Sequence, residues 1–229
     1  MQAIILAAGE GVRMRPLTLT KPKPLLEVAG KPLIRHTVEA LPSEATELII
    51  VVGYLGDQIK AYCGENFLGR AVQYVHQVEK KGTADALKLC QPLLRSGKFL
   101  IAAAPDDILD PEAWCEALQY DLCIITSTSD HPEKFGVLIL HEDGSVKDFI
   151  EKPENFISNI INTNNMVLDE RIFNYQPDPH PNGEFYLTTM VSKLAREHKV
   201  NTVVAKTWIP VATPEDLQKA EDMLSSHSN

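Results

Sequence analysis

Residues 1–16, MQAIILAAGEGVRMRP, run from a short apolar segment straight into a glycine-rich turn that is followed by two arginines. The segment Gln2–Ala7 predicts a buried β-strand, because it is short, apolar and bounded by glycine. Gly9 and Gly11 permit positive φ angles and a close approach of the backbone, so consecutive N–H groups there can surround phosphate oxygens. A G-x-G pair by itself fits an ordinary tight turn equally well, and both interpretations stay open at this point.

The turn matches neither of two common phosphate-binding fingerprints. Arg13 and Met14 stand where the dinucleotide fingerprint has its third glycine and helix, and the G-K-[ST] of a P-loop does not follow. Arg13 nevertheless offers a rigid fork of donors that suits phosphate. Lys23 lies between Pro22 and Pro24, which restrict the backbone and so limit where the ammonium group can go. The stretch therefore favours a site for an anionic ligand.

Further apolar runs alternate with helical patterns beyond this strand. Such alternation predicts a three-layer α/β fold, in which helices cover both faces of a mostly parallel central sheet. Ligands of such sheets bind at the carboxyl ends of the strands. Strands are predicted at Gln2–Ala7, Glu47–Val52, Ala71–His76, Lys98–Ala103, Asp121–Ser127 and Asn201–Thr207. Helices are predicted at Pro32–Leu41, Asp57–Gly64, Thr83–Leu94 and Pro111–Gln119.

The pattern changes after about residue 130. FGVLILHEDGSVKDFIEKP, residues 135–153, predicts a hairpin that turns at Asp143 and Gly144. TPEDLQKAEDML predicts a helix with Thr213 as N-cap and Pro214 at its first position. Because neither a linker nor a repeat separates the two halves, the sequence predicts one domain over residues 1–229.

The charge distribution limits the partners of the protein. The formal net charge of -9 argues against nucleic acid, because binding to a phosphate backbone requires a basic face. An acidic protein with one basic corner suits a small polyanion better than a long one. The cations of that corner are Arg13, Arg15, Lys21, Lys23 and Lys31.

The sequence also predicts a cytoplasmic protein without a membrane partner. Apolar runs are shorter than the roughly 20 residues that cross a bilayer, and the N-terminus lacks the basic region of a signal peptide. The four cysteines show neither a C-x-x-C pair nor the spacing of a metal finger, which favours reduced thiols.

A long stretch, LAAGEGVRMRPLTLTKPKPLLEVAGKP at residues 6–32, resembles the N-terminal motif of the sugar-1-phosphate nucleotidylyltransferases, or NDP-sugar pyrophosphorylases. The likeness continues in QVEKKGTADAL, DDIL, EKP, NGEFYLTT and WIPVATPEDL. It implies an enzyme with a Rossmann-like fold that joins a nucleoside triphosphate to a sugar 1-phosphate and releases pyrophosphate. It also implies a nucleotide-binding part at about residues 1–130 and a sugar-phosphate-binding part at about residues 131–229.

The resemblance assigns residues to the nucleotide. Gln77 stands where pyrimidine-specific relatives carry a glutamine that reads the base, and this favours UTP or dTTP. A carboxamide can donate and accept together, which suits the edge of uracil or thymine. The implied nucleotide-binding residues are Leu6, Ala8, Gly9, Gly11, Gln77, Gly82 and Thr83.

The resemblance also implies a catalytic set and a magnesium cofactor. Arg13 would bind the departing pyrophosphate end, and Lys23 would neutralise the phosphate that is attacked. Asp106 corresponds to the magnesium-binding aspartate, and Asp107 is a supporting carboxylate. Lys152 would contact the sugar phosphate.

Sugar-binding residues are implied in the second half of the chain. Glu151 matches a residue that binds sugar hydroxyls, and Asn162 falls where relatives have an asparagine that contacts the sugar. Glu184 and Tyr186 belong to GEFYLTT, which resembles the GEYYLTD of N-acetylglucosamine-1-phosphate uridylyltransferases.

Several positions depart from the family pattern, and they keep alternatives open. Pro210 is the most consequential, because relatives carry their second magnesium-binding aspartate there. One alternative is a mannose-1-phosphate guanylyltransferase-like enzyme, since RPLTLTKPKPL also occurs in that group. Another is a non-catalytic, regulatory relative that binds a sugar nucleotide. The sequence does not determine which sugar 1-phosphate and which base the protein uses. It also leaves the oligomeric state open, and a homo-oligomer is one of the alternatives. The other departures are Lys80, Lys81, Pro105, Asn164, Thr189 and Ala212.

Overall fold

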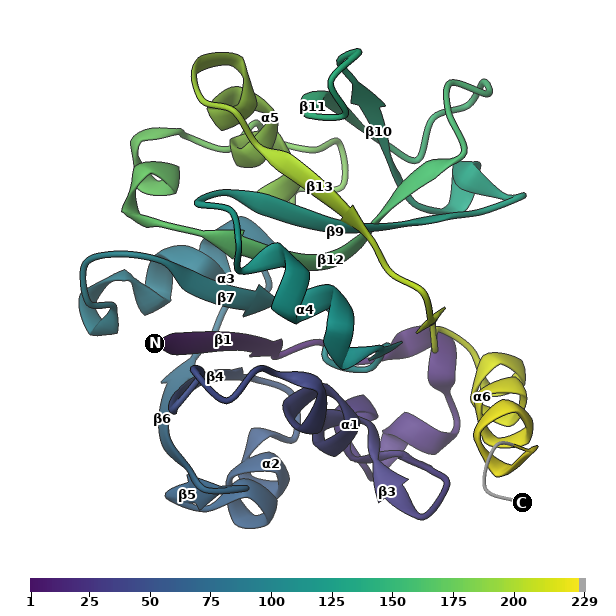
Figure 1. Cartoon of the computed structure of the whole chain (residues 1–229). Coiled ribbons are helices and arrows are strands. Elements are labelled where there is room, and N and C mark those ends of the chain that lie inside the picture. The colour runs from purple at the N-terminus through teal and green to yellow at the C-terminus, as the bar shows by residue number, and fades with distance from the viewer. Residues whose placement is uncertain (227–229) are drawn as a thin grey trace.

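The central feature of the computed structural model, which describes residues 1–226, is a ten-stranded sheet that passes through both halves of the chain (Figure 1). Its main path runs β11-β10-β12-β7-β1-β4-β6-β5, and β9 joins it through β12 while carrying β13 on its other side. The strands are β1 Gln2–Ala7, β4 Glu47–Val52, β5 Asn66–Phe67, β6 Arg70–His76, β7 Phe99–Ala102, β9 Cys123–Thr128, β10 Gly136–Leu140, β11 Val146–Glu151, β12 Ile160–Leu168 and β13 Asn201–Val204.

A parallel core forms around β1. Strands β4 and β7 flank β1 in parallel, and β6 continues the parallel order beyond β4. All six residues of β1 are buried, and the five after Gln2 are apolar, because a strand covered on both faces has no exposed side. The predicted bounds of β1 and β4 are confirmed. The carboxyl ends of these strands meet at one edge of the sheet.

The antiparallel strands come from the second half of the chain. The predicted hairpin is confirmed as β10 and β11, and Gly144 has a φ of 78° in its turn. Strand β12 pairs antiparallel with β7 and with β9, so it separates these two strands. The strand predicted at Asp121–Ser127 is present as β9, although β12 lies between it and the parallel core. A register shift in β12 lies between Asn162 and Asn165.

Helices cover both faces of the sheet, as the α/β pattern predicts. One hydrophobic core contains side chains of α1, α2 and α4, and the other contains side chains of α3 and α5. The helix predicted at Thr83–Leu94 ends at Cys90 and continues as a 3-10 turn, because Pro92 lacks the N–H that an α-helix requires. The helices are α1 Leu33–Ala40, α2 Gly56–Cys63, α3 Thr83–Cys90, α4 Pro111–Ala117, α5 Leu187–Glu197 and α6 Pro214–Ser226.

A third, smaller core joins the two ends of the chain. Met14, Leu33, Ile209 and Val211 are among its buried members. The predicted N-cap is confirmed, since the hydroxyl of Thr213 accepts from the N–H of Asp216 at 3.3 Å. This core brings the segment before α6 against the region that follows the glycine turn.

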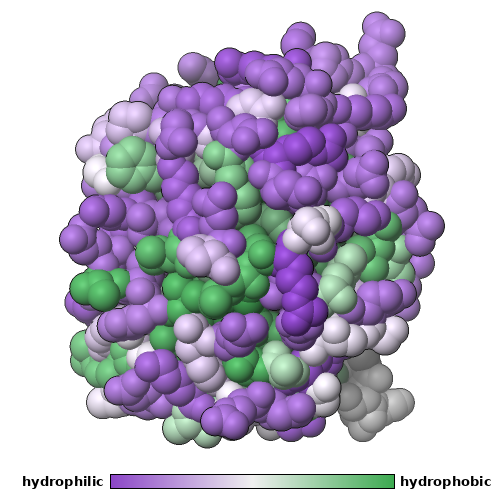
Figure 2. All heavy atoms as spheres, turned by 90° about the vertical axis from the view of Figure 1, so that its left-hand side faces the viewer, coloured by the Kyte–Doolittle hydropathy of each residue, from purple (hydrophilic) through white to green (hydrophobic). Residues whose placement is uncertain are grey.

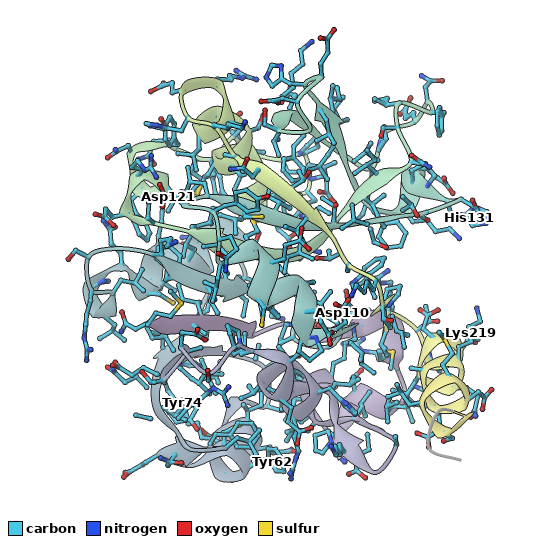
Figure 3. All side chains as sticks on the ribbon, viewed as in Figure 1. Tyr62, Tyr74, Asp110, Asp121, His131 and Lys219 are labelled. Atoms are coloured by element: carbon cyan, nitrogen blue, oxygen red, sulfur yellow. The ribbon has the colours of Figure 1, made fainter. Side chains whose placement is uncertain are left out.

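Asp110 ties α4 to the same segment (Figure 3). Its Oδ1 accepts from the N–H of Ala113 at 3.0 Å and so caps the first turn of α4. Its Oδ2 accepts from the N–H of Thr207 at 2.9 Å, just before β14, Trp208–Ile209. The carboxylate therefore links the start of α4 to the segment before β14, which pairs with β8, Ile108–Leu109.

The edge at the amino end of β1 faces the viewer in Figure 2 and is mostly hydrophilic, with apolar side chains gathered near its centre. The polar residues implied by the family motifs follow the opposite, carboxyl edge.

Among the described residues, no helix has the length and apolar character that crossing a bilayer requires.

Candidate active site

A pocket of about 500 Å³ lies at the carboxyl ends of β1, β6 and β7. This is where ligands bind in open α/β sheets. The glycine turn forms one wall, the segment from Gln77 to Ala86 forms another, and side chains of the second half complete it. The predicted site residues that line the pocket are Leu6, Ala8, Gly9, Gly11, Lys23, Gln77, Gly82, Thr83, Asp106, Glu184 and Tyr186.

The glycine turn has two glycines with different roles. Gly11 has a φ of 61°, and a Cβ there would lie 3.0 Å from the Cβ of Lys23, so packing inside the protein requires glycine. A Cβ on Gly9 would contact nothing within 4 Å. The N–H groups of Gly9, Glu10 and Gly11 donate to no group of residues 1–226. Three neighbouring donors are therefore available to an anion.

Lys23 is the central cation of the pocket. It opens the 3-10 turn Lys23–Leu25, and its ammonium group forms an ion pair with the carboxylate of Asp106. The two side chains are only 14% and 15% exposed. Burial lowers the pKa of Lys23 to about 8, and the charge of Arg13 acts in the same direction, against that of Asp107. A phosphate group beside Lys23 would stabilise its charged form.

Asp107 is held by the segment that precedes α6. It does not line the pocket, and its Oδ2 accepts from Trp208 Nε1 while its Oδ1 accepts from the N–H of Val211, both at 3.1 Å. Burial raises the pKa of Asp107 to about 6. Both oxygens of Asp107 thus accept from the protein's own donors, and its role as a supporting carboxylate stays a prediction.

Pro210 lies beside this carboxylate. Ile209 of β14 is paired with Ile108 of β8 in an antiparallel register, which places Pro210 next to Asp107. Within residues 1–226, there is no group of three or more His, Cys, Asp and Glu side chains that could hold a metal. Asp106 is thus the predicted metal ligand that faces the pocket.

Arg13 lies outside the pocket lining and is exposed. Its charge lowers the pKa of both Lys23 and Asp107, so the guanidinium lies near the glycine turn and the aspartate pair. Throughout the described chain, its side chain takes part in no hydrogen bond or ion pair. Arg13 is therefore available to an anion that extends beyond the pocket.

The wall that contains Gln77 and Gly82 is built by a direct contact between two motifs. Gly82 has a φ of 91°, and its backbone packs on Phe185, where a Cβ would lie 2.4 Å from the carbonyl oxygen. The hydroxyl of Thr83 accepts from the N–H of Leu187 at 2.9 Å. Gln77 is 9% exposed. These contacts hold QVEKKGTADAL against NGEFYLTT.

The remaining predicted residues form a cluster next to the pocket. Glu151, Lys152 and Asn162 do not line it. A Cβ on Gly136 would lie 3.1 Å from Glu151 Oε2 and 3.9 Å from the Cβ of Asn162, so Glu151 and Asn162 both adjoin Gly136. Burial raises the pKa of Glu151, and the charge of Lys152 opposes that shift. Lys152 has a φ of 44°, which is strained for a residue with a side chain.

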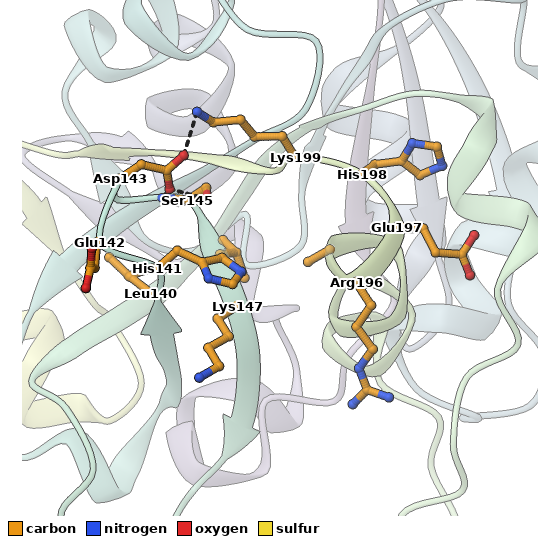
Figure 4. A pocket seen from close by; sticks show the side chains of 12 residues that line it. Leu140, His141, Glu142, Asp143, Ser145, Lys147, Arg196, Glu197, His198 and Lys199 are labelled. Carbon is orange, nitrogen blue, oxygen red and sulfur yellow. Dashed lines mark hydrogen bonds and ion pairs between the residues drawn. The ribbon is translucent and has the colours of Figure 1, made fainter.

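A wider hollow of about 810 Å³ lies between the β10–β11 turn and the end of α5 (Figure 4). None of the predicted site residues lines it. Its cations, which include Lys147 and Arg196, are matched by as many carboxylates, and Lys199 pairs with Asp143 at 2.8 Å. Such a balance gives a polyanion no net attraction, so the pocket beside the glycine turn is the candidate active site.

The family model described as nucleotidyl transferase matches residues 2–227. The chain belongs to the nucleotidyl transferase family. The resemblance drawn from the sequence is thereby confirmed.

Two curated relatives show how this nucleotidyl transferase compares in length. The bifunctional protein GlmU of Methanococcus maripaludis strain S2 is 32% identical over 227 residues, which are 97% of this chain and 54% of that protein. The chain thus spans about half the length of the GlmU relatives that it matches. The UTP–glucose-1-phosphate uridylyltransferase AglF of Haloferax volcanii is 30% identical over 241 residues, covering 100% of this chain and 98% of AglF.

Solved structures confirm the predicted fold class. A UDP-glucose pyrophosphorylase complexed with UDP-glucose has a TM-score of 0.87 and 21% identity, and the match covers 99% of this chain and 98% of that one. A putative glucose-1-phosphate thymidylyltransferase from Bacillus anthracis has a TM-score of 0.86 and 24% identity, with 97% and 94% covered. At such identities the likeness concerns the fold alone.

Sequence reasoning did not assign three polar residues at this pocket, of which Glu10 and Lys80 line it and Asn182 contacts two lining residues. Glu10 and Lys80 form an ion pair across the pocket that both of them line. Asn182 donates to Glu184 Oε2 at 3.1 Å and to the hydroxyl of Tyr186 at 2.7 Å. The only sequence signal for Asn182 is its N-G turn pair, and the Glu10–Lys80 contact spans 70 positions, so no local pattern predicts it.

Proposed function

We propose that this nucleotidyl transferase joins UTP or dTTP to a sugar 1-phosphate, releases pyrophosphate and forms an NDP-sugar in the cytoplasm. The observation that carries the proposal is the composition of one pocket. Its lining contains the free N–H groups of the glycine turn, Lys23 and Gln77. Glu184 and Tyr186 belong to the same lining and supply polar groups for a sugar. AglF, which aligns over nearly its whole length, supports the choice of UTP.

The proposed reaction is a single in-line displacement. An oxygen of the sugar phosphate attacks the α-phosphorus of the nucleotide, and the bond from that phosphorus to the bridging oxygen of pyrophosphate breaks. The protein forms no covalent bond and contributes by positioning two polyanions and by stabilising their charge. Lys23 neutralises the α-phosphate, Arg13 the departing pyrophosphate and Lys152 the sugar phosphate.

Asp106 suits a magnesium ion, because a carboxylate oxygen is a preferred ligand and one or two carboxylates suffice when substrate phosphates complete the shell. A bound magnesium ion would supply positive charge beside the α-phosphate. Asp106 would hold it, and its partner Lys23 would then turn its charge to phosphate. In the complex, Asp106 would therefore have the magnesium ion as its partner of opposite charge, and Lys23 would have a phosphate group.

We expect Pro210→Asp to lower the magnesium concentration that gives half-maximal rate by about threefold to tenfold, since a second carboxylate would then face the metal region. Pro92→Asp is the control, because Pro92 is exposed in the 3-10 turn after α3 and lies outside the pocket lining. The measurement is a magnesium titration of the initial rate. A folded Pro210→Asp variant with an unchanged requirement would show that position 210 does not face the metal.

Gln77→Ala should reduce the preference for UTP and dTTP over GTP by about tenfold, because a site built to hydrogen-bond one base edge rejects bases that leave it unpaired. The kcat/KM value for each triphosphate is measured at a fixed sugar 1-phosphate concentration. If the variant and the wild type discriminated equally between the triphosphates, Gln77 would have no role in base recognition.

The proposed function is tested by a pyrophosphate-release assay over a grid of substrates. UTP, dTTP, GTP and ATP are each combined with glucose 1-phosphate, N-acetylglucosamine 1-phosphate and mannose 1-phosphate. We expect the highest rate in a UTP or dTTP pair. Fastest release with GTP and mannose 1-phosphate would instead support the guanylyltransferase alternative, and release in no pair would support the regulatory one.

A further inference from the structure

The side-chain amide of Gln77 has its nitrogen between two acceptors. Nε2 donates to the carbonyl oxygen of Gly82 at 3.1 Å and to Asp85 Oδ2 at 2.9 Å. A backbone carbonyl and an ionised carboxylate accept hydrogen bonds and cannot donate them. If the amide were rotated by half a turn, its oxygen would face both acceptors, and two hydrogen bonds would be lost. The contacts therefore fix which end of the amide is the nitrogen.

Both N–H groups of the amide are used by these contacts. The group that Gln77 can offer to the pocket is consequently Oε1, which only accepts. The backbone N–H of Gly82 donates to no group of the described chain, so a donor accompanies this acceptor on the same wall. The wall thus presents one acceptor and one donor in a fixed order.

This order matches one type of pyrimidine edge. Uracil and thymine carry an N3–H donor between two carbonyl acceptors, whereas cytosine carries an N3 acceptor beside an amino donor. An oxygen in front of N3 pairs with uracil or thymine and meets the lone pair of cytosine. Nε2 donates to Asp85 as well as to the carbonyl of Gly82, so the orientation of the amide depends on that carboxylate together with the carbonyl.

We propose that Asp85 is a positioning residue that fixes the amide of Gln77 with its oxygen toward the base and thereby excludes cytosine. The inference rests on the proposed function and refines its base preference. Asp85 lies in the first turn of α3, where the helix dipole stabilises a carboxylate, and the charge of Lys81 acts on it as well. Asp85 does not line the nucleotide pocket, so it acts through Gln77.

Replacement of Asp85 leaves the core intact, because the side chain is half-buried beside a separate small cavity. Asp85→Asn has the same shape, but its amide can donate to Oε1 of a rotated Gln77, and Asp85→Ala removes the acceptor. We expect the ratio of kcat/KM for UTP to that for CTP to fall at least tenfold in both variants. The change should come from KM, with kcat for UTP within about threefold of the wild type.

Asp57→Asn is the matched control, since Asp57 also lies in the first turn of an eight-residue helix, α2, and is 98% exposed. The ratio should be unchanged in this variant. Calorimetric titration with UTP and with CTP in the absence of sugar phosphate gives a second measure that is independent of turnover. If the wild type prefers UTP to CTP and both Asp85→Asn and Asp85→Ala keep that preference, the role of Asp85 is overturned while the proposed function stands. A wild type without preference for UTP or dTTP would overturn the proposed base preference, and this inference with it.

Discussion

Replacing Lys23 with alanine should lower kcat/KM for pyrophosphate release by about 100-fold or more, because one preorganised charge contact to a transition state contributes roughly 3–4 kcal/mol. Three observations support so large an effect. The ammonium group lines the pocket, it is 14% exposed, and burial holds its pKa near 8, so water screens its charge little. The turn Lys23–Leu25 also holds it beside the glycine turn.

Lys21→Ala is the matched control for this experiment. Lys21 stands two positions earlier, is 41% exposed and pairs with Glu27 at 2.8 Å. Its loss should leave kcat/KM within about twofold, since surface ion pairs contribute little. Circular dichroism verifies that both variants fold. If a folded Lys23→Ala protein had the wild-type kcat/KM, Lys23 would not contribute to the reaction.

Gly82→Ala should destabilise the protein by at least about 3 kcal/mol, since it combines backbone strain with a steric clash. The backbone has a φ of 91° and a ψ of -176°, a region that residues with side chains avoid. The new Cβ would lie 2.4 Å from the carbonyl oxygen of Phe185 and 2.9 Å from its nitrogen. Both atoms belong to backbone hydrogen bonds, with Ala84 and with Lys81, so they cannot move without breaking the wall.

Gly69→Ala separates strain from clash. Gly69 also has a positive φ, 81°, but a Cβ there would contact nothing within 4 Å. The melting temperature of the Gly69→Ala variant should fall by about 2–4 °C, whereas that of the Gly82→Ala variant should fall by about 6–12 °C. Thermal unfolding followed by circular dichroism measures both. Equal shifts in the two variants would mean that the contact between Gly82 and Phe185 does not support the wall.

Local patterns predicted the parallel core because the relevant signals lie within a few residues. After Gln2 the segment to Ala7 is apolar on both faces, and Gly9 lies two positions beyond it, so its bounds follow from the strand pattern itself. Thr213 and Pro214 likewise mark the start of α6. The place of β12 was not predicted, since pairing between β12, β7 and β9 joins segments far apart in the chain.

The candidate site shows the same limit. Gly9 and Lys23 were found from a turn and from flanking prolines, which are local features. The orientation of Asp107 depends on Trp208 and Val211, which lie about 100 positions away, and a D-D pair in a sequence does not reveal which carboxylate faces a ligand. The amide of Gln77 was predicted to donate and accept, but its donors are taken by Gly82 and by a carboxylate on α3.

The configuration at the α-phosphorus tests the proposed reaction most directly. If the pocket of Lys23 and the glycine turn holds both substrates together, one in-line displacement occurs and inverts that centre. The measurement uses UTP with sulfur in one configuration at the α-phosphorus, together with the best sugar 1-phosphate from the grid, and analyses the product by phosphorus NMR. We predict an NDP-sugar of inverted configuration. Retention of configuration would require two displacements through a covalent nucleotidyl-protein, and would contradict a direct transfer between the bound substrates.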